Sequence, residues 1–198
     1  MGLGAPDAPG QTPLDEDETQ GLLLPTVATR GELDEWEQNN IEQAIQWTLG
    51  RRITPAEMFS ETFVRQLHKR MFSQVWGWAG TFRTRPKNIG IDPWQIPTQL
   101  RSLLDDARFW HTHQTFPSDE IALRFKHRIV QIHCFPNGNG RHSRLMADLI
   151  VDKIYGRPWF SWGAAHLYNP GDARSLYLQA VKAADHHDFG PLMAFARS

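Results

Sequence analysis

Apolar residues recur every three or four positions through most of this chain, and this spacing constrains the fold more than any other feature of the sequence. The clearest series places apolar side chains four residues apart, at Phe59, Phe63, Leu67 and Met71. It follows the start signal Thr54-Pro55-Ala56-Glu57, which supplies a capping side chain and a proline at the first helical position. Such a stripe lies on one face of an α-helix, so the chain is predicted to be all-α.

Similar series predict the other helices. Residues 29–50 begin with a capping box, Thr29 and Glu32, and end at a glycine. The apolar stripe expected there consists of Leu33, Trp36, Ile41, Ala44 and Ile45. Further helices are expected over residues 100–107, 118–132, 141–154 and 176–181, with a short last one from residue 190. Residues 77–96 break this period with glycines and prolines, and a small β-hairpin is expected around residues 82–84 and 89–91.

Chain length and composition favour one soluble domain. Residues 1–20 are rich in Gly, Pro and acidic side chains, so they are predicted to form a disordered tail before a single domain of residues 21–198. A net charge of −1 argues against a general nucleic-acid binder, and the one cysteine, Cys134, cannot form an internal disulfide. Neither a membrane span nor a signal peptide is evident, so the protein is expected to be cytoplasmic, without nucleic-acid or membrane partners.

A glycine-rich loop, His133–Arg144 with the sequence HCFPNGNGRHSR, separates the two most regular helical series. Gly138 and Gly140 permit left-handed or unusually close backbone geometry. The following helix begins with unpaired amides and the positive end of its dipole directed into the loop. A glycine-rich turn that enters a helix in this way is suited to binding phosphate.

Three charged or titratable side chains of the loop fit the same chemistry. Arg141 and Arg144 are three residues apart, so they lie on one helical face, where their mutual repulsion is relieved by an anion between them. A neutral His133 beside a bound phosphate can take the proton from an attacking hydroxyl. Taken singly, a helix-end histidine is more often a cap, two close arginines are usually a solvated face, and Gly-x-Gly is a weak signal. Their concentration in one short loop indicates phosphoryl or nucleotidyl transfer.

The loop resembles the signature of the Fic family, His-x-Phe-x-Asp/Glu-Gly-Asn-Gly-Arg-x-x-Arg. A second match is the segment LHKRMFSQVWGWAGTFRT followed by NIGI, which resembles the Fic helix that leads into a flap hairpin. The resemblance covers about residues 54–198, and within the family the chain is similar to the mobile mystery protein B subgroup. It implies a Fic-type helical core with a small β-hairpin flap. It also implies protein AMPylation, in which AMP passes from Mg-ATP to a Ser, Thr or Tyr hydroxyl and pyrophosphate leaves.

The resemblance also implies roles for individual residues. His133 matches the catalytic base, and Phe135 matches an apolar anchor that seats the loop in the core. An anion hole for the phosphates is implied for Gly138, Asn139 and Gly140, and a clamp on the pyrophosphate for Arg141 and Arg144. The flap is implied to dock the target segment by backbone pairing through Thr84, Asn88, Ile89 and Gly90.

Two departures from the family pattern affect metal binding and control. Asn137 stands where the family usually has an acidic residue that holds Mg²⁺, so the metal would be held by a neutral oxygen. The inhibitory motif Ser/Thr-x-x-x-Glu-Gly/Asn, whose glutamate pairs with the second arginine, has no intact copy here. Control by a separate antitoxin-like protein, as in toxin–antitoxin pairs, is therefore expected.

Three alternatives remain open from the sequence. The first is transfer of another phosphate-containing group by the same fold. The second is a metal-dependent phosphohydrolase, for which His111-x-His113 and His186-His187-Asp188 are the candidate ligands. The third is a non-catalytic nucleotide-binding module.

Overall fold

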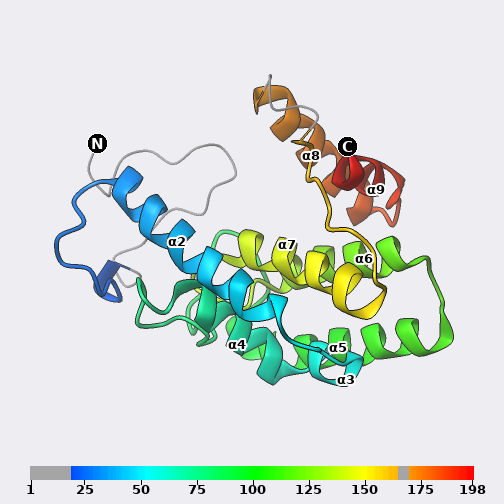
Figure 1. Ribbon diagram of the computed structural model, residues 1–198, viewed down its shortest axis with the longest axis horizontal. Helices are drawn as coiled ribbons and strands as arrows, with labels where there is room; N and C mark the ends of the chain where they lie inside the picture. Colours follow the sequence, from blue (N-terminus) through cyan, green and yellow to red (C-terminus); the bar gives the residue numbers. More distant parts are fainter. Residues whose placement is uncertain (1–18, 165–169) are drawn as a thin grey trace.

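The computed structural model describes residues 19–164 and 170–198, without the side chains of residues 170–173 (Figure 1). The all-α prediction is confirmed: the described chain is built from helices, with an isolated β-bridge between Leu22 and Trp76. Most of the tail predicted at residues 1–20 lies outside the described residues. The helices are α2 (Arg30–Leu49), α3 (Pro55–Met58), α4 (Glu61–Phe72), α5 (Ile96–His113), α6 (Ser118–Ile132), α7 (Asn139–Leu149), α8 (Pro170–Asp185) and α9 (Gly190–Arg197).

Two short helical turns complete the chain. A 3₁₀ turn, η1 (Pro93–Gln95), leads into α5, and a π-helical turn, η2 (Ile150–Ile154), extends α7. None of the described helices is both long and apolar enough for a membrane span.

The predicted capping box of α2 is confirmed, but one residue of its predicted apolar stripe is not buried. The Thr29 hydroxyl accepts from the Glu32 N–H at 3.2 Å, and the Glu32 carboxylate accepts from the Thr29 N–H at 3.0 Å. Trp36, expected to face inward, is 48% exposed, and the neighbouring Glu37 is only 3% exposed. Glu37 is buried because its carboxylate accepts a hydrogen bond from the Trp76 indole N–H at 2.6 Å.

The helix predicted from Thr54 forms in two pieces. Thr54 caps α3 by accepting from the Glu57 N–H, and Ser60 caps α4 by accepting from the Phe63 N–H at 3.1 Å. A serine that satisfies amides in this way favours a new helix start over continuation of the old helix. The apolar series that predicted the helix is nevertheless fully buried, with Phe59, Phe63, Leu67 and Met71 each at most 1% exposed.

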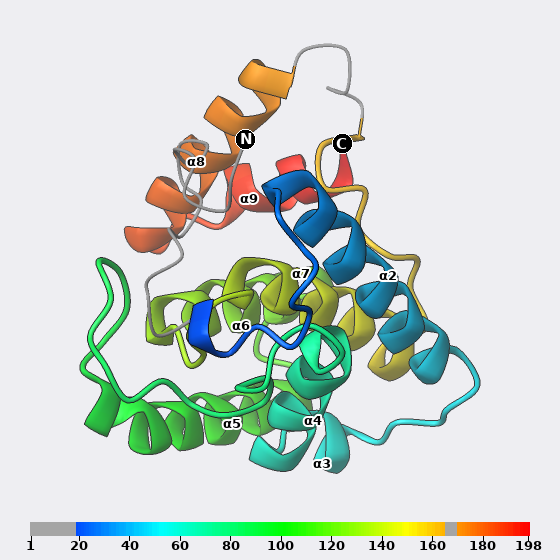
Figure 2. The same ribbon diagram turned by 90° about the vertical axis from the view of Figure 1, so that its left-hand side faces the viewer.

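The helices pack as a central body with a two-helix unit beside it. In the body, α6 packs against both α7 and α5, and α2 packs against α4. Helices α8 and α9 pack against each other, and α9 rests on α6 (Figures 1 and 2). This arrangement places α8 over the region where α6 ends and α7 begins.

The predicted β-hairpin is absent: residues 77–92 form an irregular loop with no strand, and η1 and the start of α5 follow it. Its backbone is organised by Arg83, which is 4% exposed. The Arg83 guanidinium donates to the carbonyls of His133 at 2.6 Å and Arg85 at 2.9 Å, and also to that of Ile91. Because one side chain satisfies carbonyls on both arms of the loop, a strand ladder is not needed to hold it. In Figure 2 this loop rises beside the end of α6.

Candidate functional site

The loop between α6 and α7 is fixed by two residues in left-handed backbone conformations. His133, which ends α6, has φ 55°, and Gly138, which precedes α7, has φ 76°. A left-handed histidine is unusual, and such strain persists only where surrounding contacts hold it. Here the His133 carbonyl accepts from Arg83, and its N–H donates to the Ile129 carbonyl at 3.1 Å.

One side of the loop is part of the hydrophobic core. Phe135 is fully buried, as predicted, and its ring stacks on that of His68 with the centroids 3.7 Å apart. The Asn139 carboxamide closes the loop, accepting from the Phe135 N–H at 3.0 Å and donating to the Phe135 carbonyl at 2.8 Å. The Asn139 side chain is therefore engaged within the loop, so an anion hole would have to use its backbone N–H.

Gly138 and Asn137 also face this core side. A Cβ on Gly138 would lie 2.6 Å from the ring of Phe72, so no side chain fits there. The Asn137 Oδ1 accepts from the Gly138 N–H at 2.7 Å, and the Asn137 carbonyl accepts from His68 Nε2 at 3.0 Å. The buried Asn137 Nδ2 has no hydrogen-bond partner among the described residues.

The other side of the loop lines a cavity of about 440 Å³. The loop and the first two turns of α7 contribute His133, Gly140 and Arg144, and the opposite wall comes from α8, α9 and the segment before α8. A Cβ on Gly140 would meet nothing within 4 Å, so this glycine is not required by packing. The remaining lining residues are Ile89, Val130, Trp162, Arg174, Tyr177, Leu178, Val181 and Phe195.

His133 is held neutral in this cavity. Its imidazole is 3% exposed, and neither ring nitrogen has a hydrogen-bond partner among the described residues. Burial, with a smaller contribution from the Arg83 charge, lowers the pKa of His133 to about 4. A neutral imidazole with a free ring nitrogen can accept a proton from a group placed in the cavity.

The first turn of α7 offers unpaired backbone donors beside His133. The N–H groups of Asn139, Gly140 and Arg141 form no hydrogen bond with the described part of the chain, whereas that of His142 donates to the Gly138 carbonyl at 2.9 Å. Unpaired amides at a helix start, with the helix dipole behind them, form a binding site for an anion.

The two arginines near the start of α7 have different surroundings. Arg144 is exposed and lines the cavity. Arg141 does not line it: its Nη1 lies 2.6 Å from the Glu37 carboxylate, and its guanidinium lies 4.9 Å above the centre of the Phe72 ring. Although the two arginines are only three residues apart, Arg141 therefore points to a buried carboxylate of α2 and Arg144 points to the cavity.

The flap residues expected from the sequence also differ in whether they line the cavity. Ile89 lines the cavity, and Gly90, with φ 99°, packs so closely on His133 that a Cβ would lie 2.5 Å from the histidine Cβ. Thr84 and Asn88 are exposed on the same loop and are not among the cavity-lining residues. Sequence reasoning missed Arg83, Trp162, Arg174 and Tyr177, which lie outside the signature.

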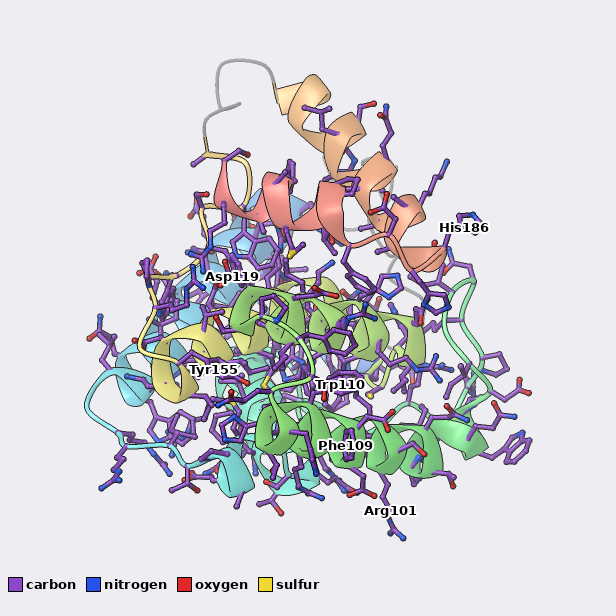
Figure 3. All side chains as sticks on the ribbon, turned by 90° about the vertical axis from the view of Figure 1, so that its right-hand side faces the viewer. Arg101, Phe109, Trp110, Asp119, Tyr155 and His186 are labelled. Atoms are coloured by element: carbon purple, nitrogen blue, oxygen red, sulfur yellow. The ribbon has the colours of Figure 1, made fainter. Side chains whose placement is uncertain are left out.

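The histidines of the phosphohydrolase alternative do not come together. His111 on α5 lies next to Tyr155, with its Nδ1 3.2 Å from the phenol oxygen. His186, just beyond the end of α8, is exposed and lies well away from Tyr155 (Figure 3). Within the described ranges, no three His, Cys, Asp or Glu residues are grouped so that they could hold a metal ion.

Comparison with known proteins relates this site to one family. A family model described as the Fic/DOC family matches residues 58–151. The Protein adenylyltransferase Fic of Drosophila virilis is 27% identical over 137 residues, which are 67% of this chain and 26% of that protein. The chain thus spans about a quarter of the length of this relative.

Solved structures share the fold. Fic-1 from C. elegans superposes with a TM-score of 0.66 at 20% identity, covering 89% of this chain and 50% of that one. BepC from Bartonella tribocorum, solved with bound AMPPNP, superposes with a TM-score of 0.64 at 15% identity, covering 92% of this chain and 97% of that one. At these identities the likeness establishes the fold alone.

Proposed function

We propose, on the premise that residues 58–151 match the Fic/DOC family model, that this chain transfers the AMP moiety of ATP to a hydroxyl of a target protein. The observation that carries the proposal is the shared cavity of His133 and the first turn of α7. In this cavity the neutral imidazole of His133 lies next to the unpaired amides of α7 and the Arg144 cation. Relatives named protein adenylyltransferases support the reaction type, and the AMPPNP held by BepC supports an adenine nucleotide as donor.

In the proposed reaction, the target hydroxyl oxygen attacks the α-phosphorus of ATP. A new P–O bond forms, the bond from the α-phosphorus to the oxygen bridging the β-phosphate breaks, and pyrophosphate leaves. The hydroxyl proton passes to the free ring nitrogen of His133. The amides of Gly140 and Arg141 face the negative charge that develops on the phosphate oxygens, and Arg144 faces the leaving group.

Magnesium belongs to this proposal as an ion carried chiefly by the nucleotide. The candidate ligand in the loop, the Asn137 carboxamide oxygen, accepts from the Gly138 N–H and keeps one lone pair. Asn137 is not among the residues that line the cavity, so its side chain would have to turn toward the nucleotide to reach the ion. Mg²⁺ binds through few protein ligands where phosphates supply the others, so this neutral ligand is compatible with a nucleotide-bound ion. The ion would neutralise phosphate charge when bound.

Control by a separate antitoxin-like protein is retained in the proposal. Arg144, the arginine that the inhibitory glutamate of the family motif would reach, has no ion pair with the residues described in the structure. The Glu37 carboxylate of α2 is paired with Arg141 instead. A partner that supplied a carboxylate to Arg144 would lower the rate of transfer.

The proposal is tested by incubating the purified protein with α-labelled ATP and a cell lysate. We expect labelled protein bands in which mass spectrometry finds AMP on Ser, Thr or Tyr. His133→Ala should reduce labelling by about 10²–10⁴-fold, which is the usual contribution of a positioned base. His113→Ala, which removes an exposed histidine on α5, is the matched control and should leave labelling unchanged.

Other outcomes would replace the proposal. ATP binding without labelled bands would indicate a nucleotide-binding module. Labelling only from a different nucleotide or from γ-labelled ATP would indicate another transferred group. Undiminished labelling by His133→Ala would remove this histidine from the mechanism.

A further inference from the structure

One face of α8 forms the cavity wall opposite the start of α7. The lining residues Arg174, Tyr177, Leu178 and Val181 follow the spacing i, i+3, i+4 and i+7, so they lie on one side of the helix. Tyr177 is held in place by Lys126, a buried residue of α6 whose ammonium group donates to the phenol oxygen. The wall therefore has a fixed aromatic residue at its centre and an arginine one turn before it.

Arg174 brings a second cation into the cavity that Arg144 already lines. Among the residues that the structure describes, the buried Arg174 Nε has no hydrogen-bond partner, and neither arginine forms an ion pair. Burying a guanidinium N–H without an acceptor is unfavourable, because its hydration is lost and nothing replaces it. Such a group indicates an acceptor that binds from outside.

Nearby acidic groups do not supply that acceptor. The Asp148 carboxylate, on α7, accepts from the Trp162 indole N–H at 3.0 Å and from the Phe160 N–H at 3.1 Å. The Glu37 carboxylate is held by Arg141 and the Trp76 indole. None of the described residues that line the cavity is acidic, so the cavity combines two arginines with unpaired helix amides. The nearby Asp148 interacts with the Arg144 charge, but its oxygens already accept from Trp162 and Phe160.

We propose that Arg174 binds the phosphates of the nucleotide donor together with Arg144, so that the clamp spans the cavity from α8 to α7. This inference rests on the proposed function, because it assigns a residue to the same nucleotide site. It changes the clamp expected from the signature, in which Arg141 was the partner of Arg144. Guanidinium groups on opposite walls can each grip a polyphosphate through paired N–H donors.

The test compares ligands with and without phosphate. Displacement of a fluorescent ATP analogue gives the affinities of the wild-type protein, Arg174→Ala and Arg174→Lys for ATP and for adenosine. Losing a hydrogen-bonded charge contact should weaken ATP binding by Arg174→Ala about 10- to 100-fold. Adenosine binding should change less than about 2-fold, and Arg174→Lys should recover part of the ATP affinity. Lys182→Ala, which removes an exposed cation of α8, should match the wild type.

Several results would overturn the assignment. Unchanged ATP affinity in Arg174→Ala would exclude a phosphate contact, and an equal loss for ATP and adenosine would reduce Arg174 to a structural role. A wild-type protein that binds no ATP would remove both the inference and the proposed function. If ATP binds but AMP is not transferred, the function fails, while a selective loss of ATP affinity in Arg174→Ala still supports the clamp.

Discussion

The loop His133–Arg144 has two faces that differ in what holds them. The core face packs into the protein through Phe135, Gly138, Arg141 and His142, whose contacts are with Phe72, His68, Glu37 and the Val64 carbonyl. The cavity face consists of His133, Gly140 and Arg144, whose side chains or Cβ positions have no such partner in the described parts of the chain. Each face contains one glycine, one arginine and one histidine.

This pairing shows that residue type alone does not assign a role within the signature. Gly138 is required by packing, whereas Gly140 borders the cavity with open space next to it. Arg141 is paired with a buried carboxylate, whereas Arg144 lines the cavity. The three pairs therefore predict opposite kinds of defect: loss of stability on the core face and loss of ligand binding on the cavity face.

The glycine pair should give the largest contrast. Gly138→Ala places a Cβ 2.6 Å from the buried Phe72 ring at a residue with φ 76°. Left-handed strain and overpacking together should lower the free energy of unfolding by about 3 kcal/mol. Gly140→Ala meets open space within a helix and should leave that free energy unchanged or raise it by up to about 1 kcal/mol.

Denaturant unfolding and ATP titration of both variants measure this contrast. The Gly140→Ala methyl group would occupy cavity space, so ATP affinity should fall in this variant although the fold is intact. Equal stability losses in the two variants, or full ATP affinity in Gly140→Ala, would contradict the division of the loop into two faces.

The arginine pair should give a smaller contrast in stability. Arg141→Ala leaves the Glu37 carboxylate, 3% exposed, without its cation, and also removes the guanidinium from the Phe72 ring. Because the Arg141 side chain is 32% exposed, we discount the penalty of a fully buried pair to about 2 kcal/mol. Arg144→Ala should change the free energy of unfolding by less than about 0.5 kcal/mol.

Thermal or urea unfolding, with ATP binding as the second measurement, separates the two variants. Glu37→Gln combined with Arg141→Ala is the matched control, since it removes the unpaired charge and should recover much of the lost stability. If Arg144→Ala destabilised the protein more than Arg141→Ala, the Arg144 side chain would have to make stabilising contacts within the protein. The cavity would then be filled by the protein itself.

The helices were predictable because their signals are local. The capping box at Thr29 and the stripe of Phe59, Phe63, Leu67 and Met71 depend only on neighbours along the chain, and both are present in the structure. The exposed Trp36 was not predictable, because burial of Glu37 in its place depends on Trp76 and Arg141, which are distant in sequence.

The site was predictable only to the extent of its signature. Loop sequence indicated a base and a phosphate cradle, and the structure places His133, Gly140 and Arg144 around one cavity. The sequence could not show that Arg141 pairs with Glu37, or that Arg174 lines the cavity from α8, because those positions depend on packing between helices. The missing hairpin has the same cause, since Arg83 satisfies backbone carbonyls that would otherwise need a strand partner.

The histidine pair should produce the smallest contrast, seen as a pH dependence of stability. Burial lowers the pKa of both His133 and His142 to about 4. Below the unfolded-state pKa of about 6.5, the histidines of the unfolded chain bind protons that those of the folded protein do not bind. The free energy of unfolding therefore falls with decreasing pH until about pH 4. Burial also raises the pKa of Asp148 to about 6, and this has the opposite sign, because protonation of the folded form then relieves a penalty. Between pH 7 and pH 5.5 the net loss from these three groups should be about 1–2 kcal/mol. Burial also lowers the pKa values of His68 and His127, which adds to the loss.

Imidazole titration by NMR, with and without a non-hydrolysable ATP analogue, assigns this pH dependence to individual residues. Both histidines should titrate well below pH 6.5 without nucleotide. The phosphates of the analogue should raise the pKa of His133, because an anion in the cavity stabilises the imidazolium. His142 should not respond, since its Nε2 donates to the Val64 carbonyl at 3.0 Å within the core. Equal responses of the two would mean that the nucleotide acts on the whole loop, and no response from His133 would place the phosphates beyond its reach.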